Sequence, residues 1–315
     1  MKIAMLGAWH VHAKGYAQEI LKRDDCSIVC VWDNDGKRGK AFADELKTTY
    51  ESELRAALNE ADAVVVNAST NIHKETIISA ARAGKHIFTE KVLASTAAEA
   101  YAIRDEVKKA GKSFLISLPF RGFSSSLCVK ENLNALGKIT AARIRNAHDG
   151  ASAGWLPPHF YDPIETQGGA MMDLGAHPMY LLLWLLGKPT HVSSAFTHTT
   201  KKDVEDNAIC LLKYENGALA VSETGFVSSN SPYSLEVFGE KASLRATRDF
   251  VELFIDGASK KIENWPSPTS SPINLFVDGV LKGGPLPYNI DDAVALSEVM
   301  DAAYRSHKSG KFEAL

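Results

Sequence analysis

Short hydrophobic runs alternate with segments of helical periodicity along the first third of the chain. The runs are rich in aliphatic and β-branched residues, which predicts buried strands at residues 2–6, 27–32, 63–67, 86–89 and 113–117. Between them, hydrophobic residues recur every three or four positions, which predicts helices over residues 11–23, 37–46, 74–83 and 96–110. Gly84 and Gly111 follow the last two segments, as is common at helix C-termini. Strands that alternate with helices of this length indicate βαβ units and a parallel sheet.

The pattern changes after Pro119. A helix is predicted over residues 124–135, followed by strands over residues 139–147, 192–199, 207–214, 218–227, 233–238 and 251–255. Asn216-Gly217 separates two of these strands and predicts a tight hairpin. Segments 150–166 and 267–287 are rich in residues that favour loops, and helical periodicity returns over residues 291–306. These features predict a second domain with an antiparallel sheet and a few helices.

Composition narrows the class of protein. The 315 residues suggest roughly two domains, and 45% hydrophobic with 23% charged residues is typical of a globular protein. A net charge of -3 provides no basic excess for nucleic acid. The four cysteines form neither a CxxC pair nor a zinc-binding spacing, which favours a reducing compartment. The apolar runs are too short for a signal peptide or a membrane span, so we expect a cytoplasmic protein without a membrane partner.

The turn after the first strand is the first candidate for chemistry. It reads Gly7-Ala8-Trp9-His10-Val11-His12, where a dinucleotide-binding turn has the pattern G-x-G-x-x-G. Only the first glycine is present, so an ordinary βα turn is an equal alternative. Asp33 ends the second strand, where an acid binds the ribose hydroxyls of NAD. Its charge favours NAD over NADP, although Arg38 leaves NADP open and Asp33 could simply cap a helix.

Two further strands end in polar residues. Ser69, Thr70 and Asn71 follow one strand, where they suit a ligand crevice and equally suit a helix cap. Glu90-Lys91 follows the next strand, where a partly buried ammonium suits proton transfer and an exposed ion pair is the ordinary alternative.

Asp173 and His177 form a third candidate, within the segment GGAMMDLGAHP. Their i, i+4 spacing predicts one shared helix face, where the carboxylate would orient the imidazole as a general base. Pro178 opposes helical geometry at His177, and a purely structural pair remains the alternative.

In this order, the segments resemble the glucose–fructose oxidoreductase / inositol dehydrogenase (Gfo/Idh/MocA) family. The segments are IAMLGAWHVHAKGYA, VWDND, NASTNIHKETIISAARAGKHIFTEKV and GGAMMDLGAHPMYLLLWLLG. The resemblance implies an α/β protein with a doubly wound, parallel Rossmann domain over residues 1–119. It also implies an α+β domain with an open, mostly antiparallel sheet over residues 120–288. In residues 289–315, the last helix would pack back on the Rossmann domain. The sheet would join the subunits of a homodimer or homotetramer.

The resemblance further implies hydride transfer between a nicotinamide cofactor and a secondary hydroxyl of a sugar, cyclitol or related polyol. By motif position, Lys91 is the catalytic lysine, and Asp173 and His177 take the acid and base positions. We expect cofactor contacts from Gly7, Trp9, His10, Val11, Asp33, Ser69, Thr70, Asn71, His73, Glu90 and Lys91. We expect substrate contacts from Arg121, Trp155, His159 and Tyr161, although Trp155 and Tyr161 equally suit loop packing.

Four positions depart from the family pattern. Trp9 replaces the second glycine, Val92 the proline after Lys91, Ala170 the third glycine of its segment, and Tyr180 the aspartate after the histidine. The same fold leaves open a glycosidase that uses NAD transiently, and Trp9 and Tyr180 motivate a non-catalytic sugar- or nucleotide-binding protein as a further alternative. His10, His12 and His73 could also bind zinc, but the spacing is weak and no carboxylate is compelled to join them, so we expect no metal.

Overall fold

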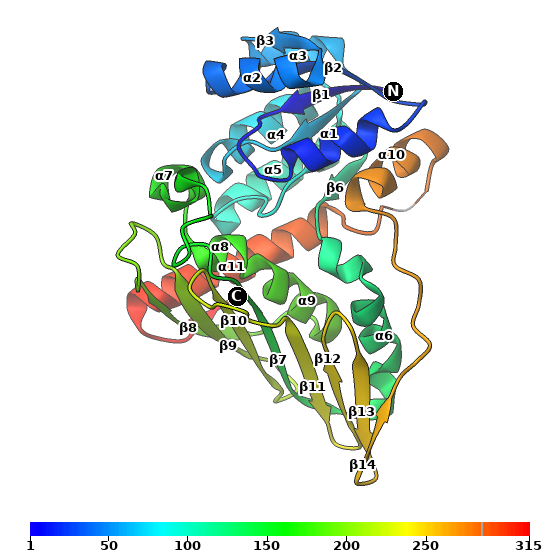
Figure 1. Ribbon diagram of the computed structural model, residues 1–315, viewed down its shortest axis with the longest axis vertical. Helices are drawn as coiled ribbons and strands as arrows, with labels where there is room; N and C mark the ends of the chain where they lie inside the picture. The colour runs from blue at the N-terminus through cyan, green and yellow to red at the C-terminus, as the bar shows by residue number, and fades with distance from the viewer. Residues whose placement is uncertain (285) are drawn as a thin grey trace. The chain divides into compact units, whose positions relative to one another are not determined.

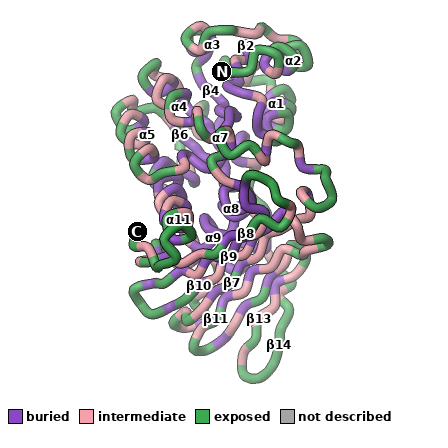
Figure 2. The backbone as a smooth tube through the Cα atoms, turned by 90° about the vertical axis from the view of Figure 1, so that its left-hand side faces the viewer, coloured by how far each residue is buried: buried purple, intermediate pink, exposed green. Residues whose placement is uncertain are grey.

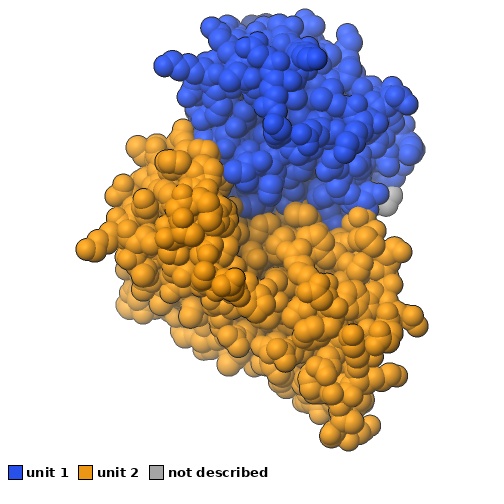
Figure 3. All heavy atoms as spheres, viewed as in Figure 1, with its two compact units in different colours: residues 1–117, 270–297 blue, residues 118–269, 298–315 orange. Residues whose placement is uncertain are grey.

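A computed structural model describes residues 1–284 and 286–315 of the chain (Figure 1). These residues form two compact units, which Figure 3 colours separately. The first unit comprises Met1–Ser117 and Ser270–Ser297, and the second comprises Leu118–Thr269 and Glu298–Leu315. The chain therefore leaves the first unit after Ser117 and contributes to it again from Ser270.

The first unit is built on a six-stranded parallel sheet in the order β3-β2-β1-β4-β5-β6. The strands are β1 (Lys2–Leu6), β2 (Ser27–Trp32), β3 (Thr49–Glu51), β4 (Ala63–Val66), β5 (His86–Thr89) and β6 (Phe114–Ile116). Every residue of β4 is buried, as expected where helices cover both faces of a sheet. The strand order reverses between β1 and β4, and ligands bind at the carboxyl ends of strands at such a point. The predicted doubly wound parallel sheet is confirmed.

Helices connect these strands, and side chains cap two of them at the N-terminus. They are α1 (Ala13–Leu21), α2 (Gly36–Leu46), α3 (Leu54–Glu60), α4 (His73–Arg82) and α5 (Ala97–Ala110). Asp35 caps α2 by accepting hydrogen bonds from two backbone amides, and Thr96 caps α5. Gly111 ends α5 in the left-handed conformation, at φ 63°. The sequence prediction omitted β3 and α3, because each is too short to display a clear period.

Helix α10 (Pro272–Lys282) corrects the prediction that residues 267–287 form only a connection. Ser271 caps the helix, Pro272 occupies its first turn and Gly283 follows its end, so the residues interpreted as loop signals are capping signals. Pro285, also within the predicted connection, lies outside the described residues. Helix α10 belongs to the first unit, whereas the sequence boundaries assigned it to the second.

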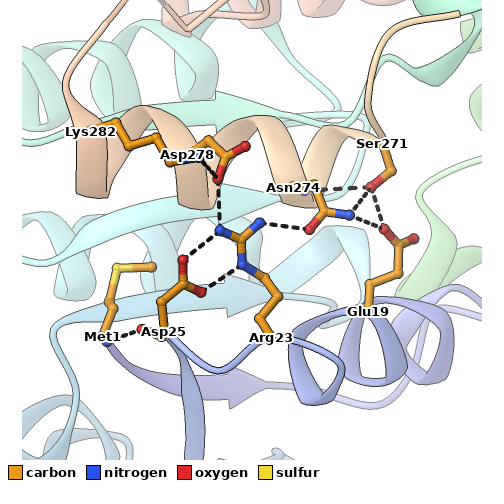
Figure 4. A network of polar contacts seen from close by, with 8 residues as sticks. All are labelled: Met1, Glu19, Arg23, Asp25, Ser271, Asn274, Asp278 and Lys282. Carbon is orange, nitrogen blue, oxygen red and sulfur yellow. Dashed lines mark hydrogen bonds and ion pairs between the residues drawn. The ribbon is translucent and has the colours of Figure 1, made fainter.

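A polar network joins α10 to α1 within the first unit (Figure 4). The Arg23 guanidinium donates hydrogen bonds of 2.7 Å to Asp278 and 3.0 Å to Asn274, and pairs with Asp25 from its own loop. Glu19 of α1 accepts hydrogen bonds from Ser271 and Asn274. The Arg23 guanidinium therefore binds the loop after α1 and helix α10 at the same time.

The second unit is built on a nine-stranded sheet in the order β14-β13-β12-β11-β7-β10-β9-β8-β15. The strands are β7 (Ile139–Ala147), β8 (His191–Thr197), β9 (Asn207–Lys213), β10 (Leu219–Gly225), β11 (Ser234–Gly239), β12 (Ser243–Ala246), β13 (Val251–Ile255), β14 (Ala258–Lys261) and β15 (Glu313–Ala314). Strands β7 and β10 are parallel and the other described pairs are antiparallel, so the sheet is mixed. The prediction omitted β12, β14 and β15, and the mostly antiparallel open sheet is confirmed.

One face of this sheet packs against helices. These are α6 (Ser124–Asn132), α8 (Ala170–Asp173) and α9 (Ala176–Leu186). Buried and more exposed residues alternate along β9 and β10, as Figure 2 shows. The other face carries Arg143 between Glu223 and Glu236, with the Arg143–Glu223 ion pair at 2.8 Å. The predicted loop 150–166 contains short helical turns at Pro158–Tyr161 and Pro163–Thr166 (α7).

The last long helix is α11 (Ile290–Ser309). Its predicted apolar face is fully buried at Ala293, Leu296, Val299, Met300 and Ala303. Residues up to Ser297 belong to the first unit and those from Glu298 to the second, so the helix contributes to both. None of the helices in the described ranges combines the length and apolar character needed to cross a bilayer.

Candidate active site

Gly7 allows the ends of β1 and β4 to approach each other closely. It has φ +93°, and a Cβ atom there would lie 2.5 Å from the backbone nitrogen of Ala68. The amide of His10 donates a 3.0 Å hydrogen bond to the carbonyl of Asn67, which extends this contact along the turn. Glycine is therefore required by both conformation and space.

The end of β4 offers an acceptor to a ligand. The Asn67 side chain is fully buried, and its Oδ1 has no hydrogen-bond partner among the residues that the structure describes. Buried polar groups normally have partners, so this orphan acceptor marks a place for a ligand donor. Together with the Gly7 turn and the acid that follows β2, it fits the polar groups of a dinucleotide.

Trp9 and Val11 differ in exposure within the turn. The Trp9 side chain is buried, at 5% exposure, whereas Val11 is exposed. The Trp9 ring centroid lies 6.2 Å from that of His10. Trp9 therefore packs into the unit at the position of the second glycine.

Asp33 is buried, and a dense set of donors surrounds its carboxylate. The Arg38 guanidinium makes two hydrogen bonds to it, of 2.9 and 2.7 Å. The backbone amides of Ala8 and Asp35 donate two more, of 2.7 and 2.8 Å. Asp33 thus fixes Arg38 at the end of β2, and Asp35 rather than Asp33 caps the following helix.

The polar residues after β4 have two different environments. Ser69 donates a 2.7 Å hydrogen bond to Asn71, and Thr70 lies between them in a short 3-10 turn. His73 is buried, with Nδ1 2.8 Å from the carbonyl of Val92 and Nε2 3.1 Å from that of Ala68. Burial lowers the pKa of His73, and the two carbonyls oppose this effect. His73 therefore links the segments that follow β4 and β5.

Glu90 and Lys91 are both buried, which contradicts the alternative of an exposed ion pair. Glu90 Oε1 lies 2.8 Å from His12 Nδ1 and accepts a hydrogen bond from Tyr16. Glu90 Oε2 accepts a 3.0 Å hydrogen bond from the Lys91 amide. Burial alone would raise the pKa of Glu90, but His10, His12 and Lys91 lower it well below the usual value of 4.5. Glu90 is therefore a buried carboxylate at neutral pH.

Asp173 and His177 do not share one helix, which corrects the prediction. Asp173 ends α8, and His177 lies in the first turn of α9. Pro178 lacks an amide hydrogen and is tolerated only in the first helical turn, so a new helix begins just before it. Burial lowers the pKa of His148, and the charge of Asp173 partly opposes this effect.

Tyr180 is the hydrogen-bonding partner that sequence reasoning missed. Its hydroxyl lies 2.8 Å from His177 Nδ1 and accepts a 3.0 Å hydrogen bond from the Phe120 amide. The Phe120 ring stacks on His177, with centroids 4.2 Å apart. Tyr180 and Phe120 thus fix the imidazole from two sides. The i, i+3 spacing of His177 and Tyr180 was the available signal.

Three of the expected substrate residues have different neighbours. Trp155 is 56% exposed, and its Nε1 donates a 2.9 Å hydrogen bond to Asp149. Tyr161 lies in a surface pocket of about 510 Å³, where the Lys202 ammonium is 4.7 Å from its ring centroid. The Arg121 guanidinium lies 5.4 Å from the Trp184 ring centroid.

His159 is the fourth expected substrate residue, and it neighbours Phe160, with ring centroids 4.9 Å apart. Arg248, which lies between β12 and β13, was not predicted from the sequence. Its guanidinium is 4.3 Å from the Phe120 ring centroid and 4.1 Å from that of Phe123.

Family models match both parts of the chain. Residues 1–117 match the model described as "Oxidoreductase family, NAD-binding Rossmann fold". Residues 132–245 match the "GFO/IDH/MocA C-terminal domain". The chain belongs to the Gfo/Idh/MocA oxidoreductase family.

Curated members of the Gfo/Idh/MocA family resemble the chain at low identity. D-xylose 1-dehydrogenase (NADP(+)) 2 of Haloferax volcanii is 24% identical and covers 98% of both chains. The 1,5-anhydro-D-fructose reductase of Ensifer adhaerens is 26% identical over 69% of this chain and 67% of its own. Myo-inositol 2-dehydrogenase of Thermotoga maritima is 30% identical over 59% of this chain and 56% of its own.

Solved structures share the two-part fold of the family. Levoglucosan dehydrogenase in complex with NADH and levoglucosan has a TM-score of 0.86 at 18% identity, covering 100% of this chain and 99% of its own. Aldose–aldose oxidoreductase from Caulobacter crescentus has a TM-score of 0.85 at 20% identity, covering 100% and 98%. At this identity the likeness establishes the fold.

Proposed function

We propose that this member of the family transfers hydride between a nicotinamide cofactor and a secondary hydroxyl of a sugar, cyclitol or related polyol. The observation that carries the proposal is the group of residues at the carboxyl ends of β1, β2, β4 and β5. It combines the glycine turn at Gly7, the acid Asp33, the orphan acceptor of Asn67 and the buried Glu90-Lys91 pair. The named activities of the relatives support the substrate class.

In this proposal the first unit supplies the cofactor contacts. The turn Gly7–Val11, Asp33, Ser69–Asn71, Glu90 and Lys91 would hold NAD, with NADP less favoured, and His73 would support the loops. When bound, the nicotinamide ring accepts or returns the hydride. The Lys91 ammonium would hold the substrate oxygen and favour its negative charge.

His177 is the proposed proton acceptor. His177 would accept the hydroxyl proton, and Tyr180 would orient the imidazole through their 2.8 Å hydrogen bond. Asp173 would act as a more distant charge. Arg121, Trp155, His159 and Tyr161 are proposed as substrate contacts because polar tips and aromatic faces suit a hydroxylated ring.

The first test is a titration with NADH and with NADPH, in which energy transfer from tryptophan to the bound cofactor is measured. A panel of polyols is then assayed for turnover. We expect saturable NADH binding, weaker NADPH binding, and net reduction of NAD by at least one polyol. The proposal would be overturned if neither NADH nor NADPH bound. Sugar conversion without net NADH would indicate the transient-oxidation glycosidase, and binding without turnover would indicate a sensor.

Substitutions test the proposed roles. Lys91→Met and His177→Ala should each lower kcat by about 10²–10⁴. The exposed Lys112→Met and His191→Ala serve as matched controls and should keep wild-type turnover. Full turnover by either site variant would contradict its role.

We also propose that a second copy of the chain covers the outer face of the large sheet, giving a homodimer or homotetramer. Four large hydrophobic residues are exposed on its strands: Ile209, Leu219, Phe238 and Phe254. Ile209→Glu should lower the sedimentation mass, whereas Leu281→Glu on α10 should not.

The four free cysteines support a reducing, cytoplasmic location, and we expect no nucleic-acid or membrane partner.

A further inference from the structure

Three side chains that suit a metal ion converge in the first unit. His10 and His12 come from the turn after β1, and Glu90 follows β5. One potential ligand atom from each lies within 4.8 Å of the other two. The imidazole rings of the two histidines have centroids 4.6 Å apart. Residues far apart in the sequence therefore meet as a compact N, N, O group.

The separations approach those of a zinc site. The Nδ1 atoms of His10 and His12 lie 3.7 and 2.8 Å from Glu90 Oε1. Tetrahedral zinc with ligands at 2.0–2.2 Å holds its ligand atoms about 3.4 Å apart. The two observed separations fall on either side of this value, and His10 Nδ1 also accepts a 3.3 Å hydrogen bond from the His12 amide, so side-chain rearrangement is needed to seat an ion.

The carboxylate already has the supporting contacts that metal ligands require. Tyr16 donates to Glu90 Oε1, and its hydroxyl also lies 2.8 Å from Ser117 Oγ. The Lys91 amide donates to the other carboxylate oxygen. Such outer contacts orient a ligating group. Glu90 and His10 are buried, whereas the His12 side chain is 46% exposed and gives an ion a route from solvent.

The structure replaces the ligand set considered from the sequence. Both ring nitrogens of His73 face backbone carbonyls, so His73 does not join His10 and His12. Glu90 provides the carboxylate that the sequence could not place. Its position beside Lys91 reduces affinity for a cation, so we expect weaker binding than at a four-ligand structural site.

We propose that His10, His12 and Glu90 bind one divalent ion of the zinc class, with further coordination positions open to water or a ligand oxygen. Three protein ligands with an open position are typical of reactive rather than structural zinc sites. Ion binding requires neither cofactor nor substrate. His10 and Glu90 are also proposed cofactor contacts, so a bound ion would compete with the cofactor for these two residues.

Cobalt(II) added to the chelator-treated full chain tests the site. We expect one equivalent to bind with visible absorption typical of tetrahedral cobalt, to quench Trp9 fluorescence, and to be displaced by zinc. Trp9 fluorescence should respond to cobalt binding because the Trp9 ring centroid is 6.2 Å from that of His10. The measurement uses no NADH, so failure here leaves the cofactor titration unaffected.

Variants identify the ligands. His12→Ala, at an exposed side chain, should lower cobalt affinity at least tenfold. Glu90→Gln should do the same, with circular dichroism showing whether this buried substitution keeps the fold. His198→Ala, an exposed histidine of the second unit, is the control. Absence of cobalt binding, or binding unchanged by His12→Ala, would overturn the proposal in favour of a hydrogen-bonded cluster alone.

Discussion

The carboxylate of Asp33 holds the guanidinium of Arg38 in a two-pronged pair, with hydrogen bonds of 2.9 and 2.7 Å. An acid at the end of β2 favours the ribose hydroxyls of NAD, whereas an arginine there suits the ribose phosphate of NADP. Here the two groups are bound to each other. Cofactor choice therefore depends on whether a ligand can recruit Arg38 from Asp33.

Arg38→Ala should sharpen the preference for NADH. Loss of a charged hydrogen bond costs about 1.5–3 kcal/mol, so NADPH affinity should fall roughly tenfold or more while NADH affinity changes little. Titration with both cofactors measures the ratio. Equal losses for the two cofactors would show that Arg38 only supports the loop.

Tyr180→Phe should lower turnover by about tenfold and alter the pH profile of kcat. The substitution removes the hydroxyl that contacts His177 Nδ1 and that accepts the Phe120 amide hydrogen, at a cost of about 1–3 kcal/mol. Asp173→Asn should change kcat less, because Asp173 and His177 lie on separate helices. A wild-type pH profile in Tyr180→Phe would indicate a packing role only.

Glu90 should stabilise the fold in a pH-dependent way. Its pKa in the folded state lies well below 4.5, so its stabilising contribution is present above pH 4.5 and is lost as the pH falls through the folded value. Urea unfolding of wild type and Glu90→Gln at several pH values measures this difference. The two stability curves should converge in acid, and a constant offset down to pH 2 would contradict the linkage.

Arg23→Ala should loosen α10. The guanidinium side chain is only 17% exposed and serves Asp25, Asn274 and Asp278, so its loss should cost about 1–3 kcal/mol. Arg82→Ala removes a solvent-exposed pair with Glu106 and should lower the stability far less than Arg23→Ala does. Limited proteolysis around residues 266–290 and urea midpoints compare the two variants.

The sequence predicted most of the first sheet because its strands are continuous apolar runs. Residues 63–66 are all buried, and such a run has few alternative structures. The i, i+4 spacing of Asp173 and His177 wrongly predicted one shared helix, because spacing alone does not reveal that the helix is interrupted between them. Pro178 places the start of a new helix before His177. Tyr180 contacts His177 and also accepts a hydrogen bond from the amide of Phe120, 60 residues away in the sequence.

The grouping of Glu90 with His10 and His12 was equally inaccessible from the sequence. It depends on β5 and β1 lying on either side of β4, which is a property of strand order and not of local pattern. Asp33 was found because its place after a strand is a local signal. Its pairing with Arg38 depends on side-chain geometry within one βα turn.

The return of the chain to the first unit at Ser270 has a consequence for synthesis on the ribosome. The sheet of that unit is complete once Ser117 has emerged, but its helix α10 is translated only after the whole of the large sheet up to β14. During that interval Glu19 of α1 and Arg23, which follows α1, lack their partners Asn274 and Asp278 on α10. The nucleotide-binding half of the protein therefore begins folding first and finishes close to last.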